Sequence, residues 1–175
     1  MNQETENAIT WPTTVGAVCI IVGGLSLFGG CLSLAGMAEM EQLHTAIPFG
    51  DGEISEELLK KLQATAPLEG VANLFSGLNI LFALALTVFG MNLLQEHPKA
   101  RTRLFVWSVL YILLTIAGII INWTPRLPLI QENSEVQGMF LAQLLISMPM
   151  YLILPIFLLI FLNRKQVRSE IASWR

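Results

Sequence analysis

Charged residues are scarce in this chain. Only 13% of its 175 residues are Asp, Glu, Lys or Arg, whereas 54% are hydrophobic; ordinary soluble domains carry about 25% charged residues. A chain this apolar is not intrinsically disordered, because disorder goes with low hydrophobicity and high net charge. The net charge of −3 also lacks the basic footprint of a nucleic-acid-binding protein. The composition therefore excludes a nucleic-acid partner and an ordinary soluble enzyme, and it indicates a membrane protein.

Residues that bind metals or form disulfides are equally scarce, with two histidines and two cysteines in the chain. His44 and His97 flank one long apolar stretch, so they are expected on opposite sides of a membrane and cannot share a haem or a zinc ion. Cys19 and Cys31 lie on one predicted helix with a rise of about 18 Å between them, whereas a disulfide needs Cα atoms within about 7 Å. No phosphate-binding loop, G-x-S-x-G or H-E-x-x-H motif is present. We therefore expect no catalytic residue, no metal and no cofactor.

Four long stretches lack any charged residue or histidine. Each exceeds the roughly 20 apolar residues that a helix needs to cross the hydrocarbon core of a bilayer. Because backbone groups in lipid must be satisfied within the segment, the spanning elements are expected to be α-helices. The sequence predicts an all-α membrane protein, an antiparallel four-transmembrane-helix bundle that forms a single membrane domain over residues 1–175. The predicted spans are residues 12–38, 70–94, 104–123 and 138–162, with Pro125 and Pro128 closing the third.

Basic residues are distributed unevenly between the two ends of these spans. The turn between the second and third spans carries Lys99, Arg101 and Arg103, and the tail at residues 163–175 carries four more basic residues. The opposite side has only three: Lys60, Lys61 and Arg126. Short basic flanks stay on the cytoplasmic side. We therefore predict that both termini are cytoplasmic and that the loop at residues 39–69 is extracytoplasmic.

A cleaved signal peptide is the alternative interpretation of the first span. The segment Phe28-Gly29-Gly30-Cys31 loosely resembles a lipoprotein cleavage box. A signal peptide needs a basic region at its start, however, and residues 1–10 contain no Lys or Arg. An uncleaved first span is therefore the favoured interpretation.

The extracytoplasmic loop is the one sizeable polar segment. Residues 54–64 are predicted to form a short amphipathic helix with Leu58, Leu59 and Leu62 on one side. Two Glu–Lys pairs four residues apart, Glu56–Lys60 and Glu57–Lys61, support it. So short a helix is marginal alone in water. We expect it to lie on the outer end of the bundle or on the lipid surface, and docking of a partner is the alternative.

Small residues recur every three or four positions along the first span. Small residues let helix backbones approach closely, which matters in lipid because apolar burial does not drive association there. The pattern predicts a helix-packing seam made of Gly16, Cys19, Gly23, Ser26, Gly30 and Ser33.

Polar, uncharged side chains recur at similar spacing in the other spans. They are expected to hydrogen-bond across helices, at about 0.6 kcal/mol each. The alternative is that they line a pore, although the spans offer no ring of charge to select ions. The residues of this polar face are Asn73, Ser76, Thr87, Ser108, Thr115, Asn122, Gln143 and Ser147.

Two features resemble a group of uncharacterised small bacterial four-span membrane proteins. One is Trp11-Pro12 followed by the glycine-rich segment from Gly16 to Gly36, and the other is the basic turn His97-Pro98-Lys99-Ala100-Arg101. The resemblance implies a bacterial inner membrane as the location and implies no activity.

These observations favour a non-enzymatic integral membrane protein acting as a scaffold, an accessory subunit or a self-associating helix bundle. Its expected partners are the lipid bilayer and either a second copy or another membrane protein. A passive oligomeric channel, with Asn73, Thr87 and Gln143 facing water, is the alternative. A membrane-interface enzyme is the least favoured hypothesis, and it would have to use residues such as Glu39, Glu41, His44, Glu96 and His97.

Overall fold

The computed structural model describes residues 11–34 and 56–174, and within these ranges it contains helices and no strand. Four helical segments are long and apolar enough to cross a membrane: Trp11–Leu32, Gly70–Leu94, Ala100–Glu132 and Ser134–Leu162. This confirms an all-helical chain with four apolar helices of spanning length. Several predicted features lie outside the described residues, namely the end of the first span, the loop to residue 55, and the side chains of Ser33, Glu56, Leu58 and Leu59.

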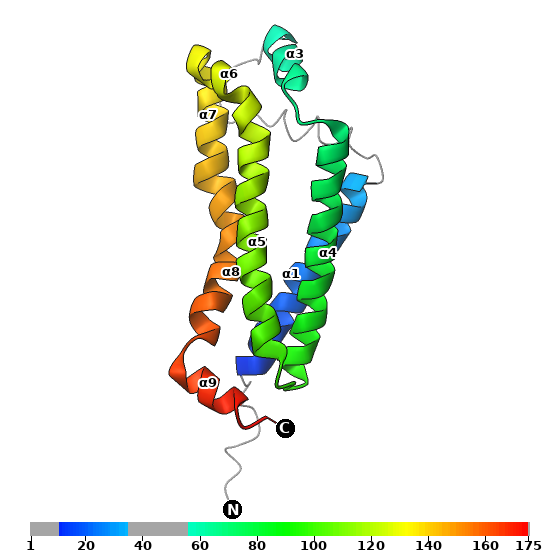
Figure 1. Cartoon of the computed structure of the whole chain (residues 1–175), viewed down its shortest axis with the longest axis vertical. Coiled ribbons are helices and arrows are strands. Elements are labelled where there is room, and N and C mark those ends of the chain that lie inside the picture. Colours follow the sequence, from blue (N-terminus) through cyan, green and yellow to red (C-terminus); the bar gives the residue numbers. More distant parts are fainter. Residues whose placement is uncertain (1–10, 35–55, 175) are drawn as a thin grey trace, which may run out of the picture.

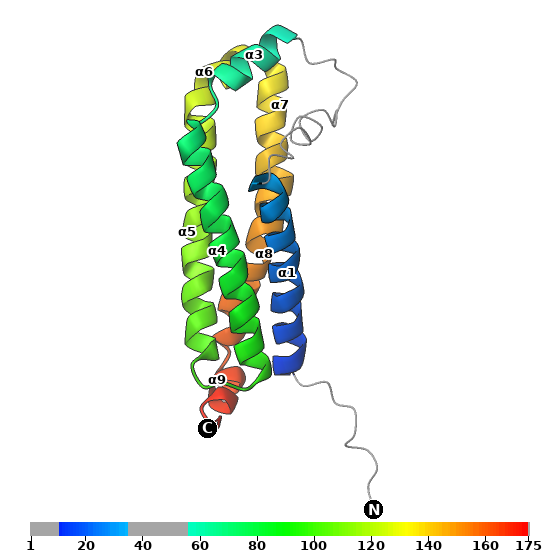
Figure 2. The ribbon, with the colours of Figure 1, turned by 90° about the vertical axis from the view of Figure 1, so that its right-hand side faces the viewer.

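The four long helices run side by side (Figures 1 and 2). Helix α1 (Trp11–Leu34) packs along α4 (Glu69–Leu94), and α5 (Ala100–Trp123) packs against both α4 and α8 (Met148–Leu162). Helix α1 makes its extensive contacts with α4 and not with α5 or α8. The short helix α9 (Lys165–Ile171) closes one end of the molecule, and α3 (Glu56–Ala64) lies at the other end.

Glycines bring α1 and α4 into close contact near the α9 end. A Cβ atom placed on Gly16 would lie 2.9 Å from the carbonyl oxygen of Gly90, and one on Gly23 would lie 2.9 Å from the carbonyl oxygen of Ala83. Farther along, a Cβ on Gly30 would meet only the side chain of Ile80. The two backbones therefore touch in the first half of α1 and stand one side chain apart in the second half.

The α9 end of the molecule is tightly packed. Leu93, Leu104, Leu158 and Leu162 are fully buried there, and Val167 and Ile171 of α9 are buried beside them. The Nε of Arg101 donates a hydrogen bond of 2.9 Å to the carbonyl oxygen of Leu162, which satisfies a backbone acceptor at the end of α8.

Trp11 joins the start of α1 to α9. Its indole Nε1 donates a hydrogen bond of 2.6 Å to Oε2 of Glu170, and its ring stacks on that of Trp174 at 5.7 Å. The tail is thereby fastened to the first long helix, so both ends of the described chain lie together.

Replacing Trp11 with alanine is expected to release α9. Both the hydrogen bond and the stack disappear, and loss of a bond to a charged group raises the population of the open tail roughly tenfold. Trypsin cleavage after Lys165 and Arg168 in mild detergent measures this population. Ser169→Ala is the matched control, because the Ser169 hydroxyl bonds only the carbonyl oxygen of Gln166 within α9. Equal cleavage rates in wild type and Trp11→Ala would show that Trp11 does not hold α9 against α1.

Two prolines shape the end of the third span differently from the prediction. Helix α5 begins at Ala100, before the predicted span of residues 104–123, and ends at Trp123 like that span. The helical path nevertheless continues beyond Trp123 through η1 (Thr124–Arg126) and α6 (Leu127–Glu132). Pro125 and Pro128 each lie in the first turn of a new helical piece, where a missing N–H is tolerated. They therefore interrupt the α-helix without ending the helical path.

The fourth span contains a widened turn. Helix α7 (Ser134–Ala142) passes into the π-helical segment η2 (Gln143–Ser147), which continues as α8. Pro149 follows at the start of α8 and offers no N–H to the carbonyl of the preceding turn. Wider turns of this kind are common at functional sites in proteins.

Helix α3 lies across the ends of α5, α6 and α7. Leu62 packs against the buried residues Trp123, Leu129 and Val136. The predicted pair of Glu57 and Lys61 is confirmed as an ion pair of 2.9 Å. The hydrogen bond from Lys61 lowers the pKa of the exposed Glu57 carboxyl group. The helix thus rests on the protein through Leu62.

Candidate binding cavity

A cavity of about 670 Å³ lies between the four long helices, in the half of the molecule away from α9. Its volume falls in the range of small-molecule sites, about 300–1,000 Å³. Every long helix contributes to its wall. Its polar lining residues are Ser26 of α1, Asn79 of α4, Tyr111, Thr115 and Asn122 of α5, Gln143 and Ser147 of η2, and Tyr151 of α8.

The wall of this cavity is uncharged and carries polar groups among a larger number of apolar residues. None of the residues that line it is Asp, Glu, Lys, Arg or His. Three carboxamides from three different elements, Asn79, Asn122 and Gln143, each supply both hydrogen-bond donors and an acceptor. An environment without charge favours an uncharged ligand, because an unpaired ion in an apolar region pays a large desolvation cost.

The floor of the cavity is rigid and closed. Trp107, only 4% exposed, donates a hydrogen bond of 2.8 Å from Nε1 to the carbonyl oxygen of Phe82 and stacks on Tyr111 at 4.9 Å. Leu86, Leu154 and Pro155 complete the floor. The fully buried leucines of the α9 end follow beneath it, so the cavity does not run through the molecule.

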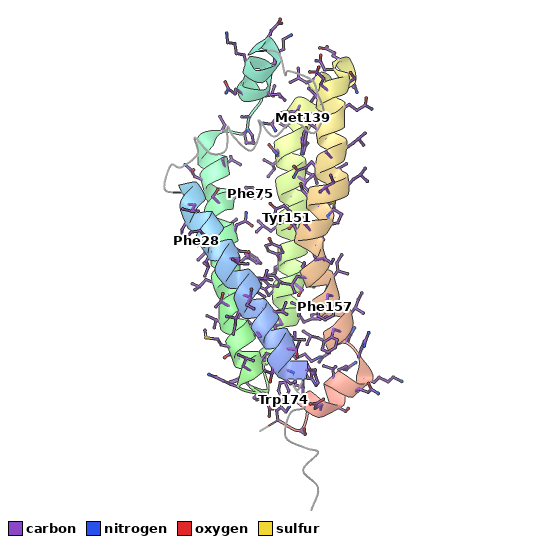
Figure 3. All side chains as sticks on the ribbon, turned by 180° about the vertical axis from the view of Figure 1, so that it is seen from behind. Phe28, Phe75, Met139, Tyr151, Phe157 and Trp174 are labelled. Carbon is purple, nitrogen blue, oxygen red and sulfur yellow. The ribbon has the colours of Figure 1, made fainter. Side chains whose placement is uncertain are left out.

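The sides of the cavity are open. Ser26, Gly29, Asn79 and Tyr151 line it and are exposed. Phe75 of α4 and Tyr151 of α8 flank the space between the α1–α4 pair and the α5–α8 pair (Figure 3). The cavity is therefore open at the side, where α1 has no extensive contact with α5 or α8.

The widened turn η2 adds two polar groups to this wall. Gln143 and Ser147 begin and end the π-helical segment, and both are half-buried. They lie four residues apart, so they share a face of the helix. This segment therefore contributes a carboxamide and a hydroxyl group to the same cavity.

The structure divides the predicted polar face into two groups. Thr115, Asn122, Gln143 and Ser147 line the cavity. The other four residues do not. The hydroxyl groups of Thr87 and Ser108 donate to the carbonyl oxygens of Ala83 and Leu104, four residues earlier in their own helices. Asn73 is exposed and Ser76 is half-buried, and neither lines the cavity.

Four polar lining residues were not assigned to this face from the sequence. The sequence places Ser26 in the packing seam and Tyr111 at the same spacing as Ser108 and Thr115, whereas Asn79 and Tyr151 belong to no predicted site. The positions of the two tyrosines could have indicated this site from the sequence. Both lie well inside apolar stretches, whereas tyrosine in membrane proteins is enriched at the interfaces. A tyrosine at mid-span indicates a polar partner or a cavity.

The members of the predicted packing seam lie in different surroundings. Gly16, Gly23 and Gly30 face α4. Cys19 is fully buried, and its Cβ lies 2.9 Å from the position that a Cβ on Gly90 would occupy. Ser26 lines the cavity, and the Ser33 side chain lies outside the described residues. Three seam glycines thus lie against α4 of the same chain rather than on a free surface.

Groups with catalytic or metal-binding chemistry are not gathered at this site. In the described ranges no three His, Cys, Asp or Glu residues cluster as metal ligands. His97 lies in the turn between α4 and α5, where its Nδ1 accepts a hydrogen bond of 3.2 Å from the backbone N–H of Lys99. Glu96 beside it adopts a positive φ of 52° in the same turn. The remaining interface candidates, Glu39, Glu41 and His44, lie outside the described residues.

Comparison of the chain with known protein families, with curated proteins and with solved structures finds no match. Function is carried by sites rather than by folds. The cavity and its surroundings are therefore the basis for the functional proposal.

Proposed function

We propose that this protein is a non-enzymatic membrane protein that binds a small uncharged molecule in the cavity between its helices. In this proposal the four long helices form an antiparallel transmembrane bundle in a bacterial inner membrane, with both termini in the cytoplasm. The observation that carries it is the uncharged polar lining of a cavity of about 670 Å³ among helices of spanning length. The protein acts as an accessory or carrier subunit for the bound molecule.

The lining favours binding over chemistry. General acid–base catalysis needs a group whose pKa lies near the working pH, and the lining offers amides, hydroxyls and phenols. Such groups orient a ligand through hydrogen bonds, and the apolar remainder of the wall accommodates its hydrocarbon part. The expected ligand is therefore an amphiphile with a neutral head that both donates and accepts hydrogen bonds.

A scaffold that associates with itself needs a surface other than the glycine seam. Gly16, Gly23 and Gly30 lie against α4. The lipid-facing side of α1 includes Ile21, Leu25 and Phe28, all exposed, and a second copy would have to use a surface of that kind. Association of two copies is compatible with the cavity but is not what the seam supports.

The passive channel receives less support from the same geometry. Of the three residues expected to face water in a channel, only Gln143 lines the cavity. Thr87 faces Gly23 of α1, and Asn73 is exposed on α4. The floor at Trp107 closes the cavity toward α9. Purified protein in liposomes is expected to conduct no ion or small solute, and flux above that of protein-free liposomes would favour the channel.

Replacing Asn122 with leucine is expected to weaken ligand binding roughly three- to twentyfold, the effect of removing one hydrogen bond inside a membrane. Molecules that copurify in mild detergent are extracted and quantified by mass spectrometry. Asn73→Leu is the matched control, because it is the same substitution at an exposed position outside the cavity. A neutral species retained by wild type and Asn73→Leu, but depleted from Asn122→Leu, supports the proposal. Equal retention by both variants, or the absence of any enriched neutral species, would refute it.

A further inference from the structure

A second hollow lies on the outside of the molecule, in the groove between α4 and α5. It has a volume of about 450 Å³, and its walls are formed by Leu81, Phe82, Ala85 and Phe89 of α4 and by Val106 and Leu110 of α5. Trp107 lies at the back of the groove and is the one residue shared with the central cavity. The two hollows are therefore separated by this side chain.

The groove is slightly shorter than the hydrocarbon depth of one bilayer leaflet. It runs along α5 from Thr102 to Leu110, and eight residues at 1.5 Å per residue span about 12 Å. One leaflet of hydrocarbon is roughly 15 Å deep, half of the 30 Å core. Figure 1 shows α4 and α5 side by side with their connecting turn at the α9 end. The polar end of the groove thus lies at the membrane surface next to α9.

The polar end of the groove carries a positive charge that is not engaged elsewhere. Thr102 and Arg103 form this end, in the first turn of α5. Arg103 is exposed, and its guanidinium group has neither a hydrogen bond nor an ion pair with any residue in the described ranges. Arg101, by contrast, is committed to the end of α8 through the carbonyl oxygen of Leu162. Lys99 adds a second positive charge in the turn, and Glu96 is the acid nearest to it in sequence.

We propose that this groove binds an anionic phospholipid of the leaflet adjoining α9. One acyl chain occupies the apolar groove against Trp107, and the phosphate accepts hydrogen bonds from Arg103 and Thr102. Arginine matches phosphate geometry with paired N–H donors, and the start of α5 adds the favourable end of a helix dipole. A zwitterionic lipid carries a cationic group next to its phosphate, which Arg103 and Lys99 repel, so the site prefers a headgroup with net negative charge.

Quenching of Trp107 fluorescence tests this site. The full-length protein is reconstituted in phosphatidylcholine bilayers that contain a small fraction of phosphatidylglycerol with brominated acyl chains. The same fraction of brominated phosphatidylcholine is the comparison lipid. The Trp107→Phe variant gives the contribution of the other tryptophans, which is subtracted. We expect the anionic lipid to quench Trp107 about fivefold more effectively than the zwitterionic lipid.

Substitutions at Arg103 and at Arg168 distinguish a specific contact with Arg103 from a general attraction between positive charges and the anionic lipid. In Arg103→Gln the preference for the anionic lipid is expected to fall to near one, whereas Arg103→Lys keeps part of it. Arg168→Gln removes an exposed positive charge on α9 that does not line the groove, and it is expected to leave the preference unchanged. Equal quenching by both lipids in wild type would overturn the proposal, as would an unchanged preference in Arg103→Gln. Neither outcome affects the central cavity, which shares no polar lining residue with this groove.

Discussion

Leucine in place of Gly23 is expected to destabilise the protein more than any other single change along α1. A Cβ at this position would collide with the hydroxyl oxygen of Thr87 and lie 2.9 Å from the carbonyl oxygen of Ala83. The backbone of α4 cannot rotate away as a side chain can, so α1 and α4 must separate. We expect a cost of about 3 kcal/mol or more, seen as a melting temperature lowered by many degrees in detergent.

The neighbouring glycine supplies the control for this substitution. A Cβ on Gly24 would meet no atom within 4 Å, and this residue is exposed. Gly24→Leu is therefore expected to melt close to wild type. The melting temperature of Gly30→Ala is expected to lie between those of the two leucine variants, because the added Cβ meets only the side chain of Ile80. Equal melting of Gly23→Leu and Gly24→Leu would show that α1 does not pack on α4 through this face.

Removal of the Trp107 side chain is expected to have an effect of similar size. Trp107→Ala removes the hydrogen bond to Phe82, the stack on Tyr111 and the wall between the two hollows. Large-to-small changes at buried tryptophans cost about 3–5 kcal/mol. Thermal unfolding followed by circular dichroism in detergent measures the loss. Trp107→Phe keeps most of the volume and is expected to lose less.

Leu113→Ala is the matched control on the same helix. The Leu113 side chain is 58% exposed, so its truncation leaves no void within the protein. A lipid-facing leucine contributes little to helix association, since lipid tails are as apolar as leucine. If Trp107→Ala and Leu113→Ala lowered the melting temperature equally, Trp107 would not be the floor of the cavity.

The helices of this fold were predictable from the sequence because lipid imposes a simple rule on them. Each spanning segment must be long, apolar and helical, and each of the four described helices of that kind overlaps one predicted span. The boundaries were less predictable. Pro125 and Pro128 predicted an end, whereas a proline in a first turn permits a new helical piece to begin. Which outcome occurs depends on the neighbouring elements that cover the turn.

About half of the polar residues that line the cavity could be predicted from the sequence. Regular spacing finds residues that face one neighbouring helix, and it placed Gly16 and Gly23 in a packing seam without identifying the helix they pack on. A cavity is bordered by several helices at once, and this one lies where α1 has no extensive contact with α5 or α8. That separation depends on tertiary packing and leaves no periodic pattern. For this reason Asn79 and Tyr151 line the cavity although their positions follow no regular spacing in the sequence.

Labelling of single cysteines in intact cells tests most directly whether the four helices cross the membrane with both chain ends on one side. The background is Cys19→Ala with Cys31→Ser, which keeps a Cβ at the buried position 19. One probe is Gln63→Cys, exposed at the end of α3, and the other is Ser173→Cys, exposed just after α9. A maleimide that cannot enter cells is expected to label Gln63→Cys at once and Ser173→Cys only after permeabilisation. Immediate labelling of both positions, immediate labelling of Ser173→Cys alone, or recovery of the protein in the lipid-free soluble fraction would contradict the account.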